Sequence, residues 1–189
     1  MHDGLSPTLS GISLAAAAAQ GRPDGDQDVG RLLARIEEEA RSGAVTLRAL
    51  LAGLRPPGLA ELGLIPAIEQ RSHQLAEPAG LTIEVTSRQP LPALDPDVEQ
   101  ATYLIIVELV ANVIRHADAT SCRVDFAADG PNLLVTITDD GRGLPPDHRP
   151  GEGLRSAVAR AEEAGGRLVL TNGHRLGTQA AVHVPGWGS

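Results

Sequence analysis

The longest apolar segment of the chain carries one polar stripe. Glu108, Asn112 and His116 recur at every fourth position, so at about 100° per residue they lie on one side of a helix. Burying a carboxylate and an amide without partners costs several kcal/mol, so we expect this stripe to line a cavity that receives a polar ligand. The pattern predicts a buried helix at about 97–116, whose other sides are formed by Leu104, Ile105, Val107, Leu109, Val110, Val113 and Ile114.

A strand with regular alternation is predicted at 133–138. Its odd-numbered residues are all apolar and its even-numbered residues include two threonines, so Asp139 continues the buried face and Asp140 the wet face. The glycines that follow, Gly141 and Gly143, allow a flat ligand to approach the backbone closely. Asp-Asp-Gly is also ordinary turn chemistry, so the motif by itself leaves a plain turn as the alternative.

The remaining segments predict a mixed sheet with helices on one side. Each strand pattern alternates apolar and polar residues, which indicates one covered face and one wet face. The predicted fold class is therefore α+β, with a two-layer α/β sandwich over residues 57–189. Its other helices are expected near 64–76 and 154–164, and its other strands at 81–87, 122–128, 167–171 and 179–184.

The N-terminal residues predict a helical hairpin that forms a separate domain at 1–56. One helix is expected at 1–20 and a second at 28–54, and Arg55-Pro56-Pro57-Gly58 then ends the hairpin. Narrow apolar faces are most simply buried against a second copy, as a four-helix bundle, and packing on the following domain is the alternative. The heptad-like stripe of the second helix is formed by Ile36, Ala40, Gly43, Leu47, Leu50 and Leu54.

Composition excludes several classes of function. A net charge of −8 over 189 residues argues against binding to nucleic acid or to an anionic membrane surface. No apolar run approaches the ~20 residues of a membrane span, and no signal peptide is recognised. The lone Cys122 excludes an intrachain disulfide and fits a reducing compartment. We therefore expect a cytoplasmic chain without membrane contact, whose core is aliphatic because aromatic residues make up only 2%.

Four motifs stand in order along the second half of the chain. They are ELVANVIRHA at 108–117, DDGRG at 139–143, GEGLR at 151–155 and GT at 177–178. Together they resemble the N, G1 and G2 boxes of the GHKL ATPase superfamily, which includes gyrase, Hsp90, MutL and sensor histidine kinases. The resemblance covers roughly residues 80–185 and implies an ATP-binding domain that uses Mg²⁺.

The first half of the chain narrows this resemblance. HDGLSPTL at 2–9, LRP at 54–56 and LGL at 62–64 resemble the phosphoacceptor hairpin of bacterial two-component sensor histidine kinases. The branch is the one with a His-Asp pair and helix-turn-helix response regulators. It implies a homodimer that phosphorylates a histidine with ATP and passes the phosphoryl group to an aspartate of a response-regulator receiver domain. The hairpin disfavours the anti-sigma-factor type of serine kinase in the same superfamily.

The resemblance also implies roles for individual residues. His2 would be the nucleophile, with Asp3 as the acceptor or base beside it, and Glu108 would act as a base or orient water or metal. Asn112 would offer its carbonyl oxygen to Mg²⁺. Asp139 would accept a hydrogen bond from the adenine amino group. The rest of the nucleotide would be bound by Arg115, His116, Gly141, Gly143, Gly151, Gly153, Leu154 and Thr178.

Some features depart from the family pattern or leave alternatives. Glu152 puts a negative charge between the phosphate-binding glycines, and Arg115 would extend to solvent if it binds no phosphate. Relatives carry at least a helical turn before the histidine, so we expect a catalytic piece, such as the cytoplasmic part of a membrane-bound sensor. If His2 is then unpositioned, the alternative is a non-catalytic ATP-binding dimer that docks a regulator. Residues 145–151 are expected to form a mobile lid, and surface or loop positions are expected for His73, His148, His174 and His183.

Overall fold

The computed structural model describes residues 36, 56–88, 90–145, 149–173 and 177–186. The chain divides into two compact units, Met1–Arg55 and Pro56–Ser189. Apart from Ile36, which is helical, the predicted hairpin lies outside the described residues, and so do His2 and Asp3. The helices and strands given below belong to the second unit.

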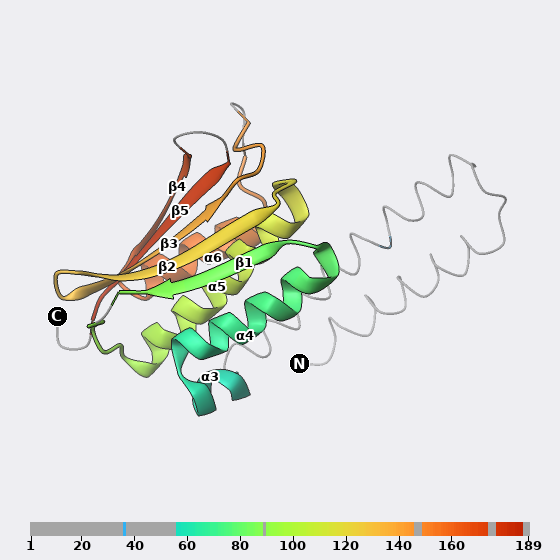
Figure 1. Cartoon of the computed structure of the whole chain (residues 1–189). Helices are drawn as coiled ribbons and strands as arrows, with labels where there is room; N and C mark the ends of the chain where they lie inside the picture. The colour runs from blue at the N-terminus through green and yellow to red at the C-terminus, as the bar shows by residue number, and fades with distance from the viewer. Residues whose placement is uncertain (1–35, 37–55, 89, 146–148, 174–176, 187–189) are drawn as a thin grey trace, which may run out of the picture. The chain divides into compact units, whose positions relative to one another are not determined.

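A five-stranded mixed sheet forms one layer of the second unit (Figure 1). Its strand order is β1-β2-β3-β5-β4, with β1 parallel to β2 and the other neighbours antiparallel. All the predicted strands are confirmed, with ends within one residue of the expected positions. The strands are β1 (Thr82–Ser87), β2 (Ser121–Asp129), β3 (Asn132–Asp139), β4 (Arg167–Asn172) and β5 (Thr178–Val184).

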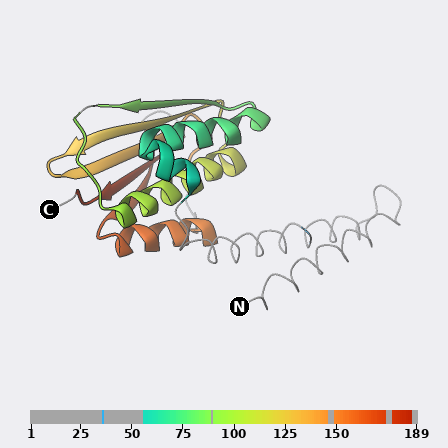
Figure 2. The same cartoon turned by 90° about the horizontal axis from the view of Figure 1, so that it is seen from below.

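Helices cover one face of this sheet, as Figure 2 shows from below. In the helical layer α5 lies between α4, which packs near β1, and α6, which packs near β4. The predicted two-layer α+β sandwich is thus confirmed for this unit. Among the described helices, none combines the length and the hydropathy that a membrane span requires. The helices are α3 (Pro57–Leu62), α4 (Leu64–Ala76), the short 3-10 helix η1 (Glu77–Ala79), α5 (Pro96–His116) and α6 (Glu152–Glu163).

Capping residues fix the ends of α5. The Asp95 side chain accepts a hydrogen bond from the Asp97 backbone N–H at 2.9 Å, and Pro96 takes the first helical position, where no N–H is needed. The helix ends at His116, as predicted, and the Ala117 N–H bonds the Val113 carbonyl at 3.0 Å. The polar stripe therefore lies in the C-terminal half of a well-defined helix.

The hydrophobic core between the two layers is aliphatic apart from Cys122 and the fully buried Phe126. In β3 the odd-numbered residues from 133 to 139 are buried and the even-numbered ones are partly exposed. Fully burying one such Val, Ile or Leu side chain contributes about 1.5–3 kcal/mol. The prediction of one covered face and one wet face is therefore confirmed, and the parity of β3 places Asp139 on the covered side.

Candidate functional site

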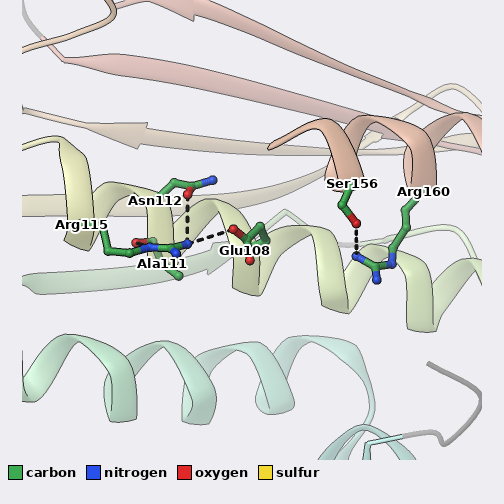
Figure 3. A network of polar contacts seen from close by, with 6 residues as sticks. All are labelled: Glu108, Ala111, Asn112, Arg115, Ser156 and Arg160. Atoms are coloured by element: carbon green, nitrogen blue, oxygen red, sulfur yellow. Dashed lines mark hydrogen bonds and ion pairs between the residues drawn. The ribbon is translucent and has the colours of Figure 1, made fainter. Parts of the chain in front are cut away.

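Two residues of the polar stripe, Glu108 and Asn112, form a hydrogen-bonded triad with Arg115 of the same helix. Arg115 Nη2 donates to Glu108 Oε1 at 2.9 Å and to Asn112 Oδ1 at 3.1 Å (Figure 3), while Nε donates to the Ala111 carbonyl at 3.1 Å. The guanidinium therefore folds back along the helix instead of extending to solvent. Glu108 is only 9% exposed, and the ion pair gives this carboxylate the cationic partner that its burial requires. Two side-chain oxygens thus converge on one cationic nitrogen.

The first turn of α6 lies against this triad. The helix begins at Glu152, two residues before the predicted start, so Gly153 and Leu154 belong to its first turn and Gly151 is the N-cap residue. A Cβ on Gly153 would lie less than 3.0 Å from the Glu108 carboxylate, so a larger residue there would displace this side chain. Backbone N–H groups of a first turn have no intrahelical acceptors, so this end of the helix carries partial positive charge. The positive end of α6 lies beside the negative Glu108 carboxylate.

Asp139 ends β3 on the buried face, as its parity predicted, and is 5% exposed. Its Oδ1 accepts a hydrogen bond from the Gly141 N–H at 2.9 Å, and within the described ranges this is the one hydrogen bond of the side chain. An ionised carboxylate has about four acceptor positions. A buried carboxylate with a single internal donor is therefore suited to receive an N–H or O–H donor from a ligand.

Two glycines allow close packing of backbone at and beside Asp139. Gly177 has φ +87°, and a Cβ there would lie less than 3.0 Å from both the carbonyl and Oδ1 of Asp139. A Cβ on Gly141 would come equally close to the Ala117 carbonyl. Both glycines therefore allow segments of this chain to pack closely together, and the approach of a flat ligand at Gly141 and Gly143 stays a prediction.

Asp140 lies on the other face and joins two strand ends. Its exposed carboxylate accepts hydrogen bonds from the Thr120 N–H at 2.8 Å, the Thr120 hydroxyl at 2.6 Å and the Ser121 N–H at 2.9 Å. The bond from the Thr120 hydroxyl is the largest cause that holds the pKa of Asp140 well below its usual range, and the bond from the Ser121 N–H adds to it. Asp140 therefore ties the start of β2 to the end of β3, a role that strand parity did not predict.

Cys122 is the cross-strand neighbour of Asp139 on β2. Burial is the main cause that raises the pKa of its thiol to about 12, and the nearby Asp139 and Asp140 carboxylates add to this effect. A thiol with this pKa stays protonated at neutral pH. Cys122 is therefore a core residue and not a nucleophile.

The other predicted site residues divide into those that are described and those that are not. His116 is exposed at the end of α5, and Thr178 begins β5 half-buried. Residues 146–148 of the predicted lid lie outside the described residues, as do His2 and Asp3. The structure thus gathers the second-half motifs around α5, the start of α6 and the end of β3.

His183 lies within β5, half-buried, and its Nδ1 is 3.3 Å from Asp129 Oδ2. Strand periodicity places it on the wet face, opposite Leu134 of β3. His73 is exposed on α4, as expected.

Asn172, the last residue of β4, was not singled out from the sequence. Its Oδ1 accepts a hydrogen bond from the Leu144 N–H at 2.7 Å. Asn172 bonds the backbone of Leu144, and every residue except proline has the same backbone N–H. The sequence therefore contains no motif for this contact.

Two family models match the chain. The model described as histidine kinase-, DNA gyrase B- and HSP90-like ATPase matches residues 97–187. The model described as histidine kinase matches residues 1–59. The first match contains the triad, Asp139 and the α6 glycines, and the second contains His2.

Curated relatives are similar over most of the chain. The sensor histidine kinase NarS of Mycobacterium tuberculosis is 34% identical over 168 residues, which cover 85% of this chain and 37% of NarS. The sensor histidine kinase MctS of Rhizobium johnstonii is 30% identical over 191 residues, 98% of this chain and 41% of MctS. LiaS of Bacillus subtilis is 28% identical over 188 residues, 98% of this chain and 52% of LiaS. The chain thus spans about half, or less, of the length of these relatives.

Solved structures share the fold at low sequence identity. The Acinetobacter baumannii histidine kinase AdeS has a TM-score of 0.63 at 17% identity, over 95% of this chain and 97% of that one. The histidine kinase domain of the Erythrobacter litoralis EL346 blue-light activated histidine kinase has a TM-score of 0.57 at 20% identity, over 94% and 95%. The ATP binding domain of PrrB from Mycobacterium tuberculosis has a TM-score of 0.52 at 21% identity, over 65% of this chain and 93% of that one.

Proposed function

Because the chain belongs to the sensor histidine kinase family, with an ATPase domain of the GHKL type, we propose that it is the catalytic core of a two-component sensor. ATP bound between α5, α6 and the end of β3 phosphorylates His2, and the phosphoryl group passes to an aspartate of a response-regulator receiver domain. Residues 1–56 form the dimerising phosphoacceptor hairpin and residues 57–189 the ATP-binding domain. The use of ATP places this reaction in the cytoplasm.

The observation that carries this proposal is the buried Asp139 carboxylate. Within the described residues its side chain has one internal donor, and Gly177 brings backbone close to it. The exocyclic amino group of adenine is a donor attached to a flat, largely apolar ring. A hydrogen bond from this group to a carboxylate is worth about 1.5–3 kcal/mol, and guanine presents an acceptor at the same position. The Asp139 end therefore favours adenine.

The α5–α6 end suits the phosphates. The first turn of α6 offers backbone N–H groups and a positive helix end, which is the usual environment for a phosphate at a helix N-terminus. Arg115 supplies a cation beside it, and Glu108 holds that guanidinium by an ion pair at 2.9 Å. We assign Arg115 to phosphate neutralisation and Glu108 to orienting this cation. Glu152, the first residue of α6, is exposed, so its charge is screened by solvent.

The donor set also fits Mg²⁺. Asn112 Oδ1 and Glu108 Oε1 are hard oxygen ligands that already converge on a cationic nitrogen, Arg115 Nη2. Within the described residues no group of three or more His, Cys, Asp and Glu side chains forms a complete metal site. Mg²⁺ would therefore be held by Asn112 together with oxygens of the nucleotide and of water. When bound, it supplies positive charge against the phosphates.

The phosphorylation step is a nucleophilic substitution at phosphorus. A ring nitrogen of neutral His2 attacks the γ-phosphorus, the bond to the β,γ-bridging oxygen breaks, and ADP leaves with that electron pair. Asp3 accepts a hydrogen bond from the other ring nitrogen and stabilises the imidazolium. In the second step, a regulator carboxylate attacks the phosphorus and the imidazole leaves.

Incubation with Mg²⁺ and γ-labelled ATP tests the proposal. The wild-type chain should acquire a label that is stable in alkali and labile in acid, as a phosphorus–nitrogen bond is. His2→Gln should lose the label and keep its affinity for ATP, and Asp3→Asn should slow labelling by ~10²-fold. The matched control His73→Gln, at an exposed position of α4, should keep both properties.

Two results would contradict this assignment. Label that survives in His2→Gln places the phosphoacceptor elsewhere. ATP binding without any label, also after helical residues are added before Met1, favours a non-catalytic ATP-binding module.

A further inference from the structure

Asn172 joins two segments that are distant in sequence and lie at the same end of the sheet (Figure 1). Its Oδ1 accepts from the Leu144 N–H at 2.7 Å, and its Nδ2 donates to the Leu144 carbonyl at 3.4 Å. Leu144 belongs to the segment that leaves β3 after Asp139. One side chain at the end of β4 therefore satisfies both backbone groups of a single residue in that segment.

This pairing depends on the carboxamide group. A carboxamide carries a donor and an acceptor side by side, as a peptide unit does, so Asn172 pairs with Leu144 much as a neighbouring strand would. A carboxylate provides only the acceptor, and a methyl group provides neither. The geometry thus uses a property that only Asn and Gln side chains have.

The segment held by Asn172 is packed against Gly177, the glycine beside Asp139. Gly143, with φ +75°, is so close that a Cβ there would lie 3.0 Å from Asn172 Oδ1 and 3.1 Å from the Gly177 carbonyl. The Gly177 carbonyl also accepts from the Gly173 N–H at 2.9 Å. Gly177 in turn touches Asp139, as described above. These contacts connect the base-binding carboxylate to Asn172 through backbone alone.

We propose that Asn172 is a positioning residue for the nucleotide base. By fixing Leu144 and Gly143 against Gly177, it holds the backbone walls beside Asp139 in the binding geometry before the ligand arrives, which lowers the ordering cost of binding. This inference rests on the proposed function, because it takes the base to bind at Asp139. Asn172 acts on the Asp139 end and not on the α6 end, so its loss weakens adenosine, ADP and ATP by the same factor.

Binding measurements on two variants and a control test this. Asn172→Ala should weaken adenosine, ADP and ATP alike, on the order of tenfold, and speed hydrogen exchange of the Leu144 amide. Asn172→Asp keeps the acceptor for the Leu144 N–H, so the Leu144 amide should stay protected from exchange. This variant should lose less affinity for adenosine than Asn172→Ala does, since adenosine carries no phosphate charge that the new carboxylate would repel. Asn132→Ala, at the start of β3 beside the β2–β3 turn, is the matched control and should change neither.

Wild-type affinity in Asn172→Ala overturns the inference and leaves the proposed function standing. An equal loss of affinity in Asn132→Ala, in step with its melting temperature, also overturns it, because the effect is then one of general stability. A wild-type protein that binds none of the three ligands overturns the proposed function, and the inference with it.

Discussion

The two ends of the proposed nucleotide site differ in whether backbone or side chains form them. At the Asp139 end the walls are backbone, with Gly141 and Gly177 in contact with their neighbours. At the α5–α6 end they are the charged and polar side chains of Glu108, Asn112 and Arg115. Side chains change rotamer readily, whereas backbone that is packed against backbone moves only with the strands that carry it.

This difference assigns different tasks to the two ends. If a base binds at the Asp139 end as proposed, it meets a carboxylate that is already held in place by the Gly141 N–H. At the other end Arg115 already places a positive charge beside Glu108 and Asn112. A bound nucleotide with its cation would therefore replace some of the contacts that Arg115 makes with these two side chains. We therefore expect the Asp139 end to determine which base binds, and the α5–α6 end to change its contacts on binding.

The largest expected effect comes from the carboxylate of the Asp139 end. Asp139→Asn should weaken ATP binding by about 10- to 100-fold, because it removes the carboxylate of a buried side chain. Asp140→Asn should change ATP affinity by less than about threefold, since this carboxylate faces the other side of the strand. Calorimetric titration of both variants measures this difference, and equal losses would show that the base does not bind on the buried face of β3.

Two glycine variants compare the Asp139 end of the site, where backbone is packed closely, with the α5–α6 end, where side chains lie. Gly177→Ala combines a left-handed φ, strained by about 1–2 kcal/mol, with a collision against the Asp139 backbone, so adenosine and ATP should weaken together by about tenfold. Gly153→Ala collides only with the flexible end of Glu108, so ATP should weaken more than adenosine. Competition binding with both ligands provides the measurement. The comparison fails if the two variants show the same ratio of ATP to adenosine affinity.

The features that were predicted correctly are those that periodicity reports. The alternation of β3 identified Asp139 as buried, and polar residues at every fourth position identified the stripe of α5. Both patterns repeat with the period of the strand or helix, because one face of each element is buried. The start of α6 was placed two residues too late. Glycine has a low helix propensity, so the residue pattern did not indicate that Gly153 belongs to the first turn of the helix.

The features that were not predicted are specific hydrogen bonds of polar side chains. The return of Arg115 onto Glu108, the bonds of Asp140 to the start of β2 and the pairing of Asn172 with Leu144 each join a polar group to one particular neighbour. Family resemblance indicated which residue types stand at the site. It did not indicate their contacts, because rotamers and side-chain-to-backbone bonds are decided by the packed structure.

The ion pair of the α5–α6 end should show a moderate coupling. In a double-mutant cycle of Glu108→Gln and Arg115→Met, we expect a coupling of about 1 kcal/mol in the free energy of unfolding, since one partner is buried and the other is 37% exposed. The coupling should fall with added salt. Chemical denaturation without nucleotide gives these values. The surface pair Glu84–Arg123, at 2.8 Å with both side chains more than half exposed, is the control and should couple less.

The smallest expected effect is the pH dependence that Asp140 contributes to stability. Its folded-state pKa lies below the unfolded value of about 3.9, so the stabilisation is present above that pH and is lost as the pH falls below it. Asp140→Asn should therefore lower the melting temperature by a few degrees at pH 6, and the difference from wild type should shrink below pH 4. Asp118→Asn, which loses only a surface ion pair to Arg142 at 3.3 Å, is the control and should cause a smaller shift at pH 6. A difference that persists undiminished at pH 3 would mean that the Thr120 and Ser121 bonds do not depend on the charge of Asp140.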